Sequence, residues 1–234
     1  YRPTRINHVV SGGDYGWRQG TDKWPAYFPD SLPGNADIGL GSPTAIAFGT
    51  DSNFPGLYRR ALFILDWAYG KIFAIHLSPE GASYRGQAEE FVTGRPLNVT
   101  GMDFGPDGAM YFVTGGRRTK SGLYRVRYVG DEPPPPLGQA ASGEAKRARE
   151  LRRQLEQFHS QRSIEGVGLS WQHIGSDDPW IRHAARVALE NQALVQWQLP
   201  ALTESNTRKA LTALMALARS SDPKVQSQIF GRLN

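Results

Sequence analysis

The chain has 234 residues, 39% of them hydrophobic and 21% charged, and a formal net charge of +5. The excess is spread evenly, with 14 basic and 11 acidic residues in 1–130 and 13 and 11 in 131–234. Nucleic-acid-binding proteins concentrate such an excess on one element, so no nucleic-acid partner is indicated. Cysteine is absent, which excludes disulfides, thiolate metal sites and c-type haem attachment within these residues. No run approaches the roughly 18 apolar residues of a membrane-spanning helix.

The N-terminal segment predicts a strand at 5–10. Tyr1 is not an initiator methionine, no signal peptide opens the chain, and the sequence begins close to this strand. We therefore expect the chain to be a piece of a longer protein.

Residues 1–130 are predicted to form a partial β-propeller, namely the C-terminal blades of a larger ring. They hold 20 of the 26 glycines, which separate short apolar runs of strand length. These runs are 45–48, 61–65, 71–77, 110–113 and 123–129. The segment Thr44–Asp51 recurs 56 residues later as Thr100–Asp107, and each copy leads into two apolar strands. A repeat of this length is typical of propeller blades.

A proline-rich linker is predicted at 131–145. Four consecutive prolines at 133–136 can neither donate to a strand ladder nor continue a helix, so they predict a stiff spacer. Glycines at 138 and 143 add flexibility. We therefore expect a domain boundary here.

Residues 146–234 predict an α-helical array of HEAT-like repeats. Apolar residues from Ile181 to Leu189 follow helical spacing, with Asp178 as the expected N-cap before Pro179. The Asp-Pro pair returns 44 residues later at 222–223, a spacing typical of HEAT-type helix pairs. We expect Ile181, Ala185 and Leu189 to face two leucines of the next helix, Leu211 and Leu214.

The most specific motif is Ser11-Gly-Gly-Asp-Tyr-Gly-Trp17. A phosphate-binding loop is excluded, because the Lys-Ser/Thr pair is missing and no helix follows. The structural interpretation is a glycine-permitted turn with Tyr15 and Trp17 packed beneath it.

Around this motif the chain resembles a known family. Residues 5–17 are similar to soluble quinoprotein glucose/sorbosone dehydrogenases, which are six-bladed propellers. More broadly, the chain resembles planctomycete-type membrane-bound dehydrogenases, in which such a propeller precedes HEAT repeats. Segments 61–77 and 108–126 carry the resemblance further, and it covers nearly all residues outside the linker.

The resemblance implies a bacterial, periplasmic or cell-surface oxidoreductase. Its propeller would use pyrroloquinoline quinone (PQQ) and calcium to oxidise a sugar or related alcohol, and electrons would pass to a c-type haem outside this chain. The alternative is a non-catalytic propeller and HEAT scaffold that binds protein or carbohydrate, with a protein partner on the HEAT surface. Because the family's general base and most cofactor ligands lie upstream of the Gly-Gly motif, we expect the chain alone to be inactive.

Two further positions depart from the family pattern. In the sugar dehydrogenases, two basic clusters help to hold the cofactor. These clusters align with Ala68–Tyr69 and Asn98–Thr100 of this chain, where no residue is cationic. PQQ carries three carboxylates, so charge pairing would be lost there. The chain therefore either binds a quinone differently or keeps the scaffold without the cofactor.

Four residues at two turns are the candidates for a substrate or cofactor channel: Asp66, Trp67, Arg117 and Arg118. Alternatively, Asp66 caps backbone amides of the turn, Trp67 is a packing residue, and Arg117 and Arg118 form a solvated hairpin tip. No catalytic residue is assigned. No metal site is assigned either, since the five histidines lack metal-ligand spacing.

Overall fold

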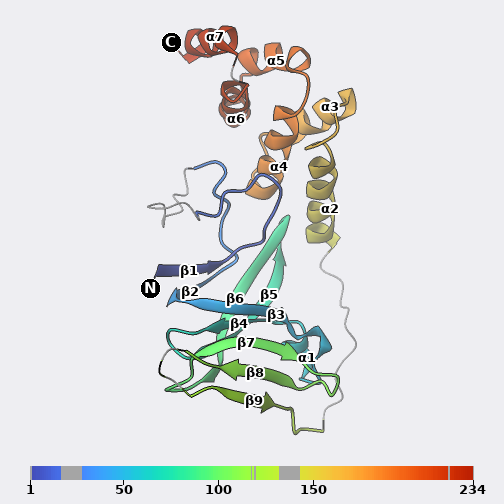
Figure 1. Ribbon diagram of the computed structural model, residues 1–234. Helices are drawn as coiled ribbons and strands as arrows, with labels where there is room; N and C mark the ends of the chain where they lie inside the picture. The colour runs from blue at the N-terminus through green and yellow to red at the C-terminus, as the bar shows by residue number, and fades with distance from the viewer. Residues whose placement is uncertain are drawn as a thin grey trace. The chain divides into compact units, whose positions relative to one another are not determined.

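A computed structural model describes residues 2–16, 28–116, 118, 120–131, 143–220 and 222–233. It combines antiparallel sheets with α-helices (Figure 1). The chain divides into two compact units. The strand-rich unit comprises Tyr1–His8, Pro33–Pro79 and Tyr84–Ala140, and the helical unit comprises Val9–Leu32, Glu80–Ser83 and Ala141–Asn234. The helical unit thus draws on three separate parts of the sequence.

Three antiparallel sheets run in chain order in the strand-rich unit. The first pairs β1 (Arg2–Ile6) with β2 (Ala36–Gly41). The second has the order β3 (Pro43–Phe48), β4 (Leu62–Asp66), β5 (Lys71–Glu80) and β6 (Ser83–Thr93). The third has β7 (Val99–Phe104), β8 (Met110–Thr114) and β9 (Gly122–Val126). Short helices η1 (Gly49–Asp51) and α1 (Gly56–Arg59) follow β3.

The second and third sheets pack face to face. Strand β7 contacts both β3 and β4, as Figure 1 shows. Buried apolar side chains from both sheets fill the contact, among them Phe63, Leu65, Val99 and Phe112. The repeated segments that begin at Thr44 and Thr100 form β3 and β7, the first strand of each sheet. The sequence repeat is therefore a structural repeat.

Strand positions were predicted best where the strands are apolar. The runs at 61–65 and 110–113 coincide with β4 and β8 within one residue. The strand predicted at 5–10 was wrong, because β1 ends at Ile6. Strands β2 and β6 were missed. Five of the eleven residues of β6 are exposed and polar side chains interrupt the strand, so it gives no apolar run.

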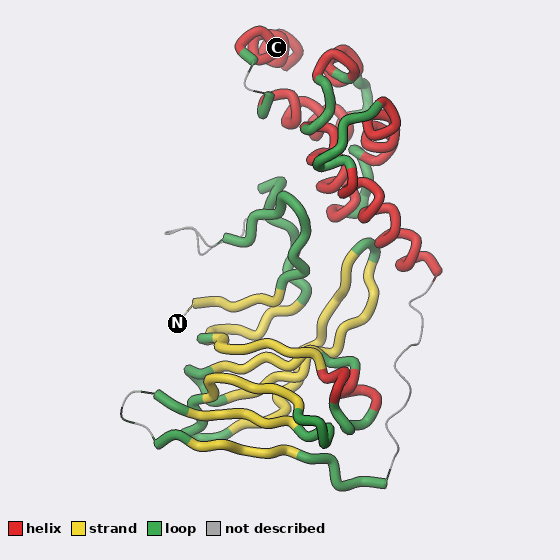
Figure 2. Tube along the Cα trace, turned by 45° about the vertical axis from the view of Figure 1, so that its right-hand side comes forward, coloured by secondary structure: helices red, strands yellow, loops and turns green. Residues whose placement is uncertain are grey.

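The helical unit consists of short helices joined by short loops, drawn in red and green in Figure 2. They are α2 (Gly143–Gln157), α3 (Ile164–His173), α4 (Pro179–Glu190), η2 (Leu194–Gln196), α5 (Gln198–Thr203), α6 (Thr207–Ala218) and α7 (Pro223–Leu233). The predicted N-cap is confirmed, because Asp178 Oδ1 accepts hydrogen bonds from Trp180 N at 2.8 Å and Ile181 N at 3.2 Å. Within the described ranges, no helix is long and apolar enough to cross a membrane.

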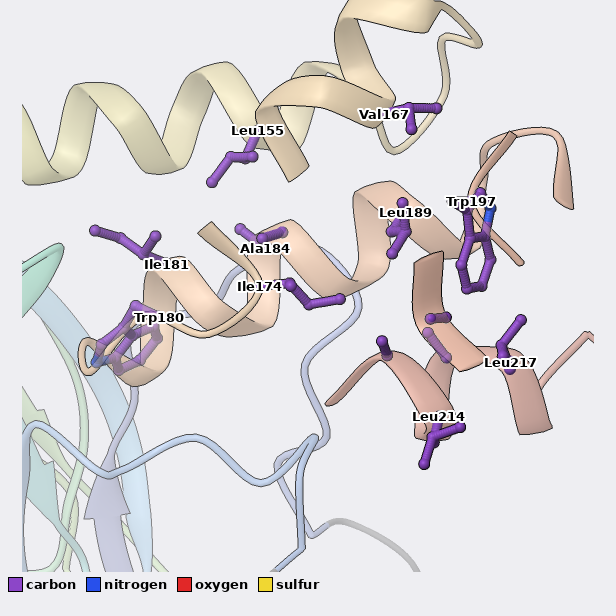
Figure 3. Close-up of a cluster of buried hydrophobic side chains, with 14 of the residues drawn as sticks. Leu155, Val167, Ile174, Trp180, Ile181, Ala184, Leu189, Trp197, Leu214 and Leu217 are labelled. Carbon is purple, nitrogen blue, oxygen red and sulfur yellow. The ribbon is translucent and has the colours of Figure 1, made fainter. Parts of the chain in front are cut away.

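A single apolar core holds the helical unit together. Side chains of α2 and α4 approach each other in Figure 3, where Leu155 lies opposite Ile181 and Ala184. Ile181, Ala185, Leu189 and Leu214 share this core, as predicted. The prediction for Leu211 was wrong, since it is 61% exposed. Leu32 and Ala82 complete the core from outside the helices.

Candidate functional site

Asp66 ends strand β4 and is buried, with 2% of its surface exposed. Its Oδ1 accepts hydrogen bonds from Ser42 N at 2.8 Å and from Ala68 N at 3.0 Å. A Cβ on Gly41 would lie 3.2 Å from Oδ2, so backbone also closes over the second oxygen. In this position the carboxylate caps the turn after β4, and Asp66 does not belong to the lining of the pocket described below.

Trp67 forms hydrogen bonds with three other segments of the strand-rich unit. Its backbone nitrogen donates to Ser42 O at 3.0 Å, and its indole Nε1 donates to Gly115 O at 2.9 Å. Its carbonyl accepts a hydrogen bond from Asn98 Nδ2 at 3.1 Å. Asn98 O in turn accepts one from Gly115 N at 2.9 Å. The β4–β5 turn, the β6–β7 loop and the β8–β9 loop therefore meet at Trp67.

A pocket of about 170 Å³ opens beside this junction. It is formed by the β4–β5 turn and the β6–β7 loop, and its lining is Ala68, Tyr69, Gly70, Gly94, Arg95, Pro96, Leu97 and Asn98. Gly70 has a φ of +62°, and a Cβ there would lie 2.4 Å from Gly94 O. Gly94 N also donates to Gly70 O at 3.1 Å. Glycine at position 70 is thus required for the two walls to approach each other.

The pocket lining offers one charge and two polar side chains. Arg95 is exposed, and it has no hydrogen-bond or ion-pair partner among the residues that the structure describes. Tyr69 is 37% exposed. No histidine or carboxylate belongs to the lining. The arrangement can bind a small ligand with an anionic group, and its lining includes no general base.

Of the two candidate arginines, Arg118 belongs to the described residues. Arg118 is exposed, has a φ of +64°, and belongs to the β8–β9 loop without lining the pocket. Arg117 lies outside the described residues. The sequence motifs indicated Asp66 and Trp67 of the β4–β5 turn as channel candidates and did not indicate Arg95, the central residue of a Gly-Arg-Pro loop at 94–96.

A second polar group links β5, β6 and α1. His76 Nε2 lies 2.6 Å from Glu89 Oε2, and the Tyr58 hydroxyl donates to Glu89 Oε1 at 2.9 Å. The hydrogen bond with His76 lowers the pKa of Glu89, and the bond to Glu89 raises the pKa of Tyr58. His76 Nδ1 is buried. Nε2 of His76 is therefore engaged by Glu89, and Nδ1 is shielded from solvent.

A third group fixes the turn between β7 and β8. Asp107 Oδ1 accepts from Ala109 N at 3.1 Å, and Oδ2 accepts from the Tyr111 hydroxyl at 3.0 Å and from Arg125. The backbone hydrogen bond from Ala109 is the largest cause of a lowered Asp107 pKa. Gly108, with a φ of +71°, supplies the turn conformation. This group lies at the surface and stabilises the hairpin.

The helical unit contains a charge cluster around a buried arginine. Arg186 is 1% exposed and binds both Asp30 and Glu190, and the partly exposed Arg219 also binds Asp30. Burial raises the pKa of Glu190. His183 Nε2 donates to Ser11 O at 3.0 Å, and burial lowers the His183 pKa to about 4. Two positive and two negative charges balance here, as a stable buried cluster requires.

The Gly-Gly motif forms the predicted turn within the helical unit. Gly12 and Gly16 have φ values of +77° and +69°, and Asp14 Oδ1 accepts from Gly16 N at 2.8 Å. The Tyr15 hydroxyl accepts from Val10 N at 2.7 Å. Trp17 lies outside the described residues. The motif thus acts as a folded turn anchored by its tyrosine.

Comparison with protein-family models, curated proteins and solved structures gave no match to this chain. A complete PQQ site does not fit the described residues. The pocket supplies one cation for three carboxylates, and its volume is below the roughly 300–1,000 Å³ of typical small-molecule sites. No group of three or more metal-ligating side chains occurs in the described part of the chain.

Proposed function

We propose that the strand-rich unit is part of a β-propeller and the helical unit part of a HEAT-like array. The propeller is supported by successive antiparallel sheets that stack face to face and begin with the same sequence repeat at β3 and β7. The HEAT-like array is supported by helices α4 and α7, which both begin at an Asp-Pro pair 44 residues apart.

Exposed apolar side chains support further blades on both sides. Ile46 and Phe48 of β3 are 60% and 53% exposed, although their cross-strand partners on β4, Ile64 and Leu62, are buried. On the third sheet Leu123 is 71% exposed. Such faces are normally covered in soluble proteins, and neighbouring blades would cover them.

The function we propose for the whole protein is that of a sugar or alcohol oxidoreductase at the bacterial periplasm or cell surface. One observation carries this proposal. The resemblance places cofactor contacts at two positions, and one pocket is lined by residues from both, namely Ala68, Tyr69 and Asn98. Any PQQ and calcium would need residues beyond this chain, as would the c-type haem. The chain by itself is expected to be inactive.

Dye reduction tests this proposal. The full-length gene product, supplied with PQQ and calcium, is expected to reduce a redox dye when aldoses or polyols are added. The 234-residue chain under the same conditions is expected to give only the blank rate. A folded full-length protein that reduces no dye with any of these substrates would show that it is not such an oxidoreductase.

A second candidate is a non-catalytic scaffold that binds carbohydrate or protein. The observation that favours it is the absence of any histidine or carboxylate from the pocket lining. Under this alternative the full-length protein would bind a ligand at the pocket without dye reduction. Equilibrium binding and turnover measured on the same preparation therefore separate the two candidates.

A further inference from the structure

We propose that the pocket beside Trp67 is selective for a sugar acid, and that Arg95 is the residue that confers this selectivity. The inference rests on the proposed function, since it names the ligand class of the same pocket. The inferred ligand differs from a neutral sugar in carrying a negative charge. A neutral sugar would leave the one charged residue of the lining without a partner.

Arg95 is the one charged residue among those that line the pocket. Its side chain is exposed, and within the described ranges no carboxylate pairs with it. A guanidinium presents two parallel N–H donors that match the two oxygens of one carboxylate. One cation therefore neutralises one carboxylate, whereas a phosphate dianion needs more positive charge than this lining holds.

The pocket volume and the uncharged residues of the lining indicate a ligand with a single ring. A cavity of about 150 Å³ is known to hold benzene, and the pocket is of similar size at about 170 Å³. Tyr69 and Asn98 belong to its lining together with two glycines. A flat aromatic surface beside amide and backbone groups suits the apolar face and hydroxyls of one sugar ring.

The walls of the pocket are held before any ligand binds. Asn98 is fixed by hydrogen bonds to Trp67 O and from Gly115 N, at 3.1 and 2.9 Å. Gly94 N binds Gly70 O across the pocket floor at 3.1 Å. Preorganised walls reduce the entropy lost on binding, so a small ligand can be held by few contacts.

Isothermal titration of the 234-residue chain tests the inference. The probes are D-glucuronate, D-glucose, D-glucose 6-phosphate and acetate, each added to wild type, Arg95→Gln and Arg60→Gln. Arg60 follows α1 at the opposite end of β4 from the pocket and is also exposed, so it is a matched control for charge removal. Circular dichroism confirms that each variant is folded.

Glucuronate is expected to bind wild type at least about tenfold more tightly than glucose or acetate. Arg95→Gln should remove this preference, and Arg60→Gln should keep it. If glucose and glucuronate bind equally and Arg95→Gln changes neither affinity, the proposed selectivity is wrong. That result would still be compatible with an oxidoreductase that acts on neutral sugars. Preference for glucose 6-phosphate or acetate would overturn the sugar-acid class. No binding of any probe would overturn the pocket as a sugar site, while dye reduction by the full-length protein would still decide the proposed function.

Discussion

Two carboxylates, one in each unit, are satisfied in different ways. In the strand-rich unit, Asp66 is capped by backbone amides of the adjacent turn and of Ser42. In the helical unit, Asp30 is bound by Arg186 and Arg219, which lie 156 and 189 residues away in the sequence. One carboxylate therefore depends on backbone amides, and the other on the charged side chains of distant residues.

This difference determines where each unit is vulnerable. A capping carboxylate can be replaced by another hydrogen-bond acceptor at modest cost. A buried ion cluster has no such substitute, since removing one member leaves an unpaired charge in a dry environment. We therefore expect single substitutions in the helical unit to have larger effects than those at the turns of the strand-rich unit.

The largest effect is expected from Ala185→Arg. Ala185 is completely buried in the core of the helical unit. An arginine there would place a charge without a partner and overfill the core, so the helical unit should fail to fold, with a cost above about 4 kcal/mol. Ala218→Arg, at an exposed position of α6, is the control and should retain wild-type helicity at 222 nm. A folded Ala185→Arg variant would contradict the core described for α4.

The next largest effect is expected from Arg186→Ala. It removes the shared partner of Asp30 and Glu190 and should lower the free energy of unfolding by about 3–5 kcal/mol. Arg208→Ala is the control, because Arg208 forms a largely exposed ion pair with Asp177 and should cost less than about 1 kcal/mol. Urea denaturation measures both. Similar losses in the two variants would show that the cluster does not stabilise the unit.

A smaller effect is expected from acidification. The folded-state pKa of His183 is about 4, below the usual 6.5, so between these values the unfolded chain binds the additional proton. Stability should be complete above pH 6.5 and fall as the pH drops toward 4, by up to about 3 kcal/mol at 1.4 kcal/mol per pKa unit. Protonation of His183 would place a positive charge beside the Arg186 guanidinium, whose Nη2 lies 3.3 Å from His183 Nδ1.

Comparison with His183→Gln isolates this contribution. Burial also lowers the pKa of His159 and raises that of Glu190, and these groups remain in both proteins. The stability difference between wild type and variant should therefore shrink as the pH falls. Parallel pH profiles for the two proteins would show that His183 is not the group responsible.

The smallest effect is expected at Asp66. Asp66→Ala leaves the amides of Ser42 and Ala68 without their acceptor and should cost about 1–3 kcal/mol in the strand-rich unit. Asp66→Asn keeps one oxygen acceptor and should cost less. Thermal unfolding followed by near-ultraviolet circular dichroism measures both. A larger loss for Asn than for Ala would indicate that the charge of Asp66 has a role beyond capping the turn.

Local patterns in the sequence predicted what local forces determine. The strand at 61–65 is an apolar run between turn residues, and Asp178 is an N-cap followed by proline, so both could be located. The ion pair between Asp30 and Arg186 joins residues 156 positions apart, and no spacing rule connects them. Arg95 stands in no motif and lies three residues before the aligned position at Asn98, so only the folded loop shows that it belongs to the pocket lining.

The pocket beside Trp67 is the proposed ligand site of the strand-rich unit. Backbone amide chemical shifts of the labelled 234-residue chain, followed while D-glucuronate is added, test it most directly. The account predicts that signals from 68–70, 94–95 and 97–98 move together and saturate, while those around Asp107 and along α4 stay in place. Saturable shifts around Asp107 and Arg125, with none at 68–70, would contradict it.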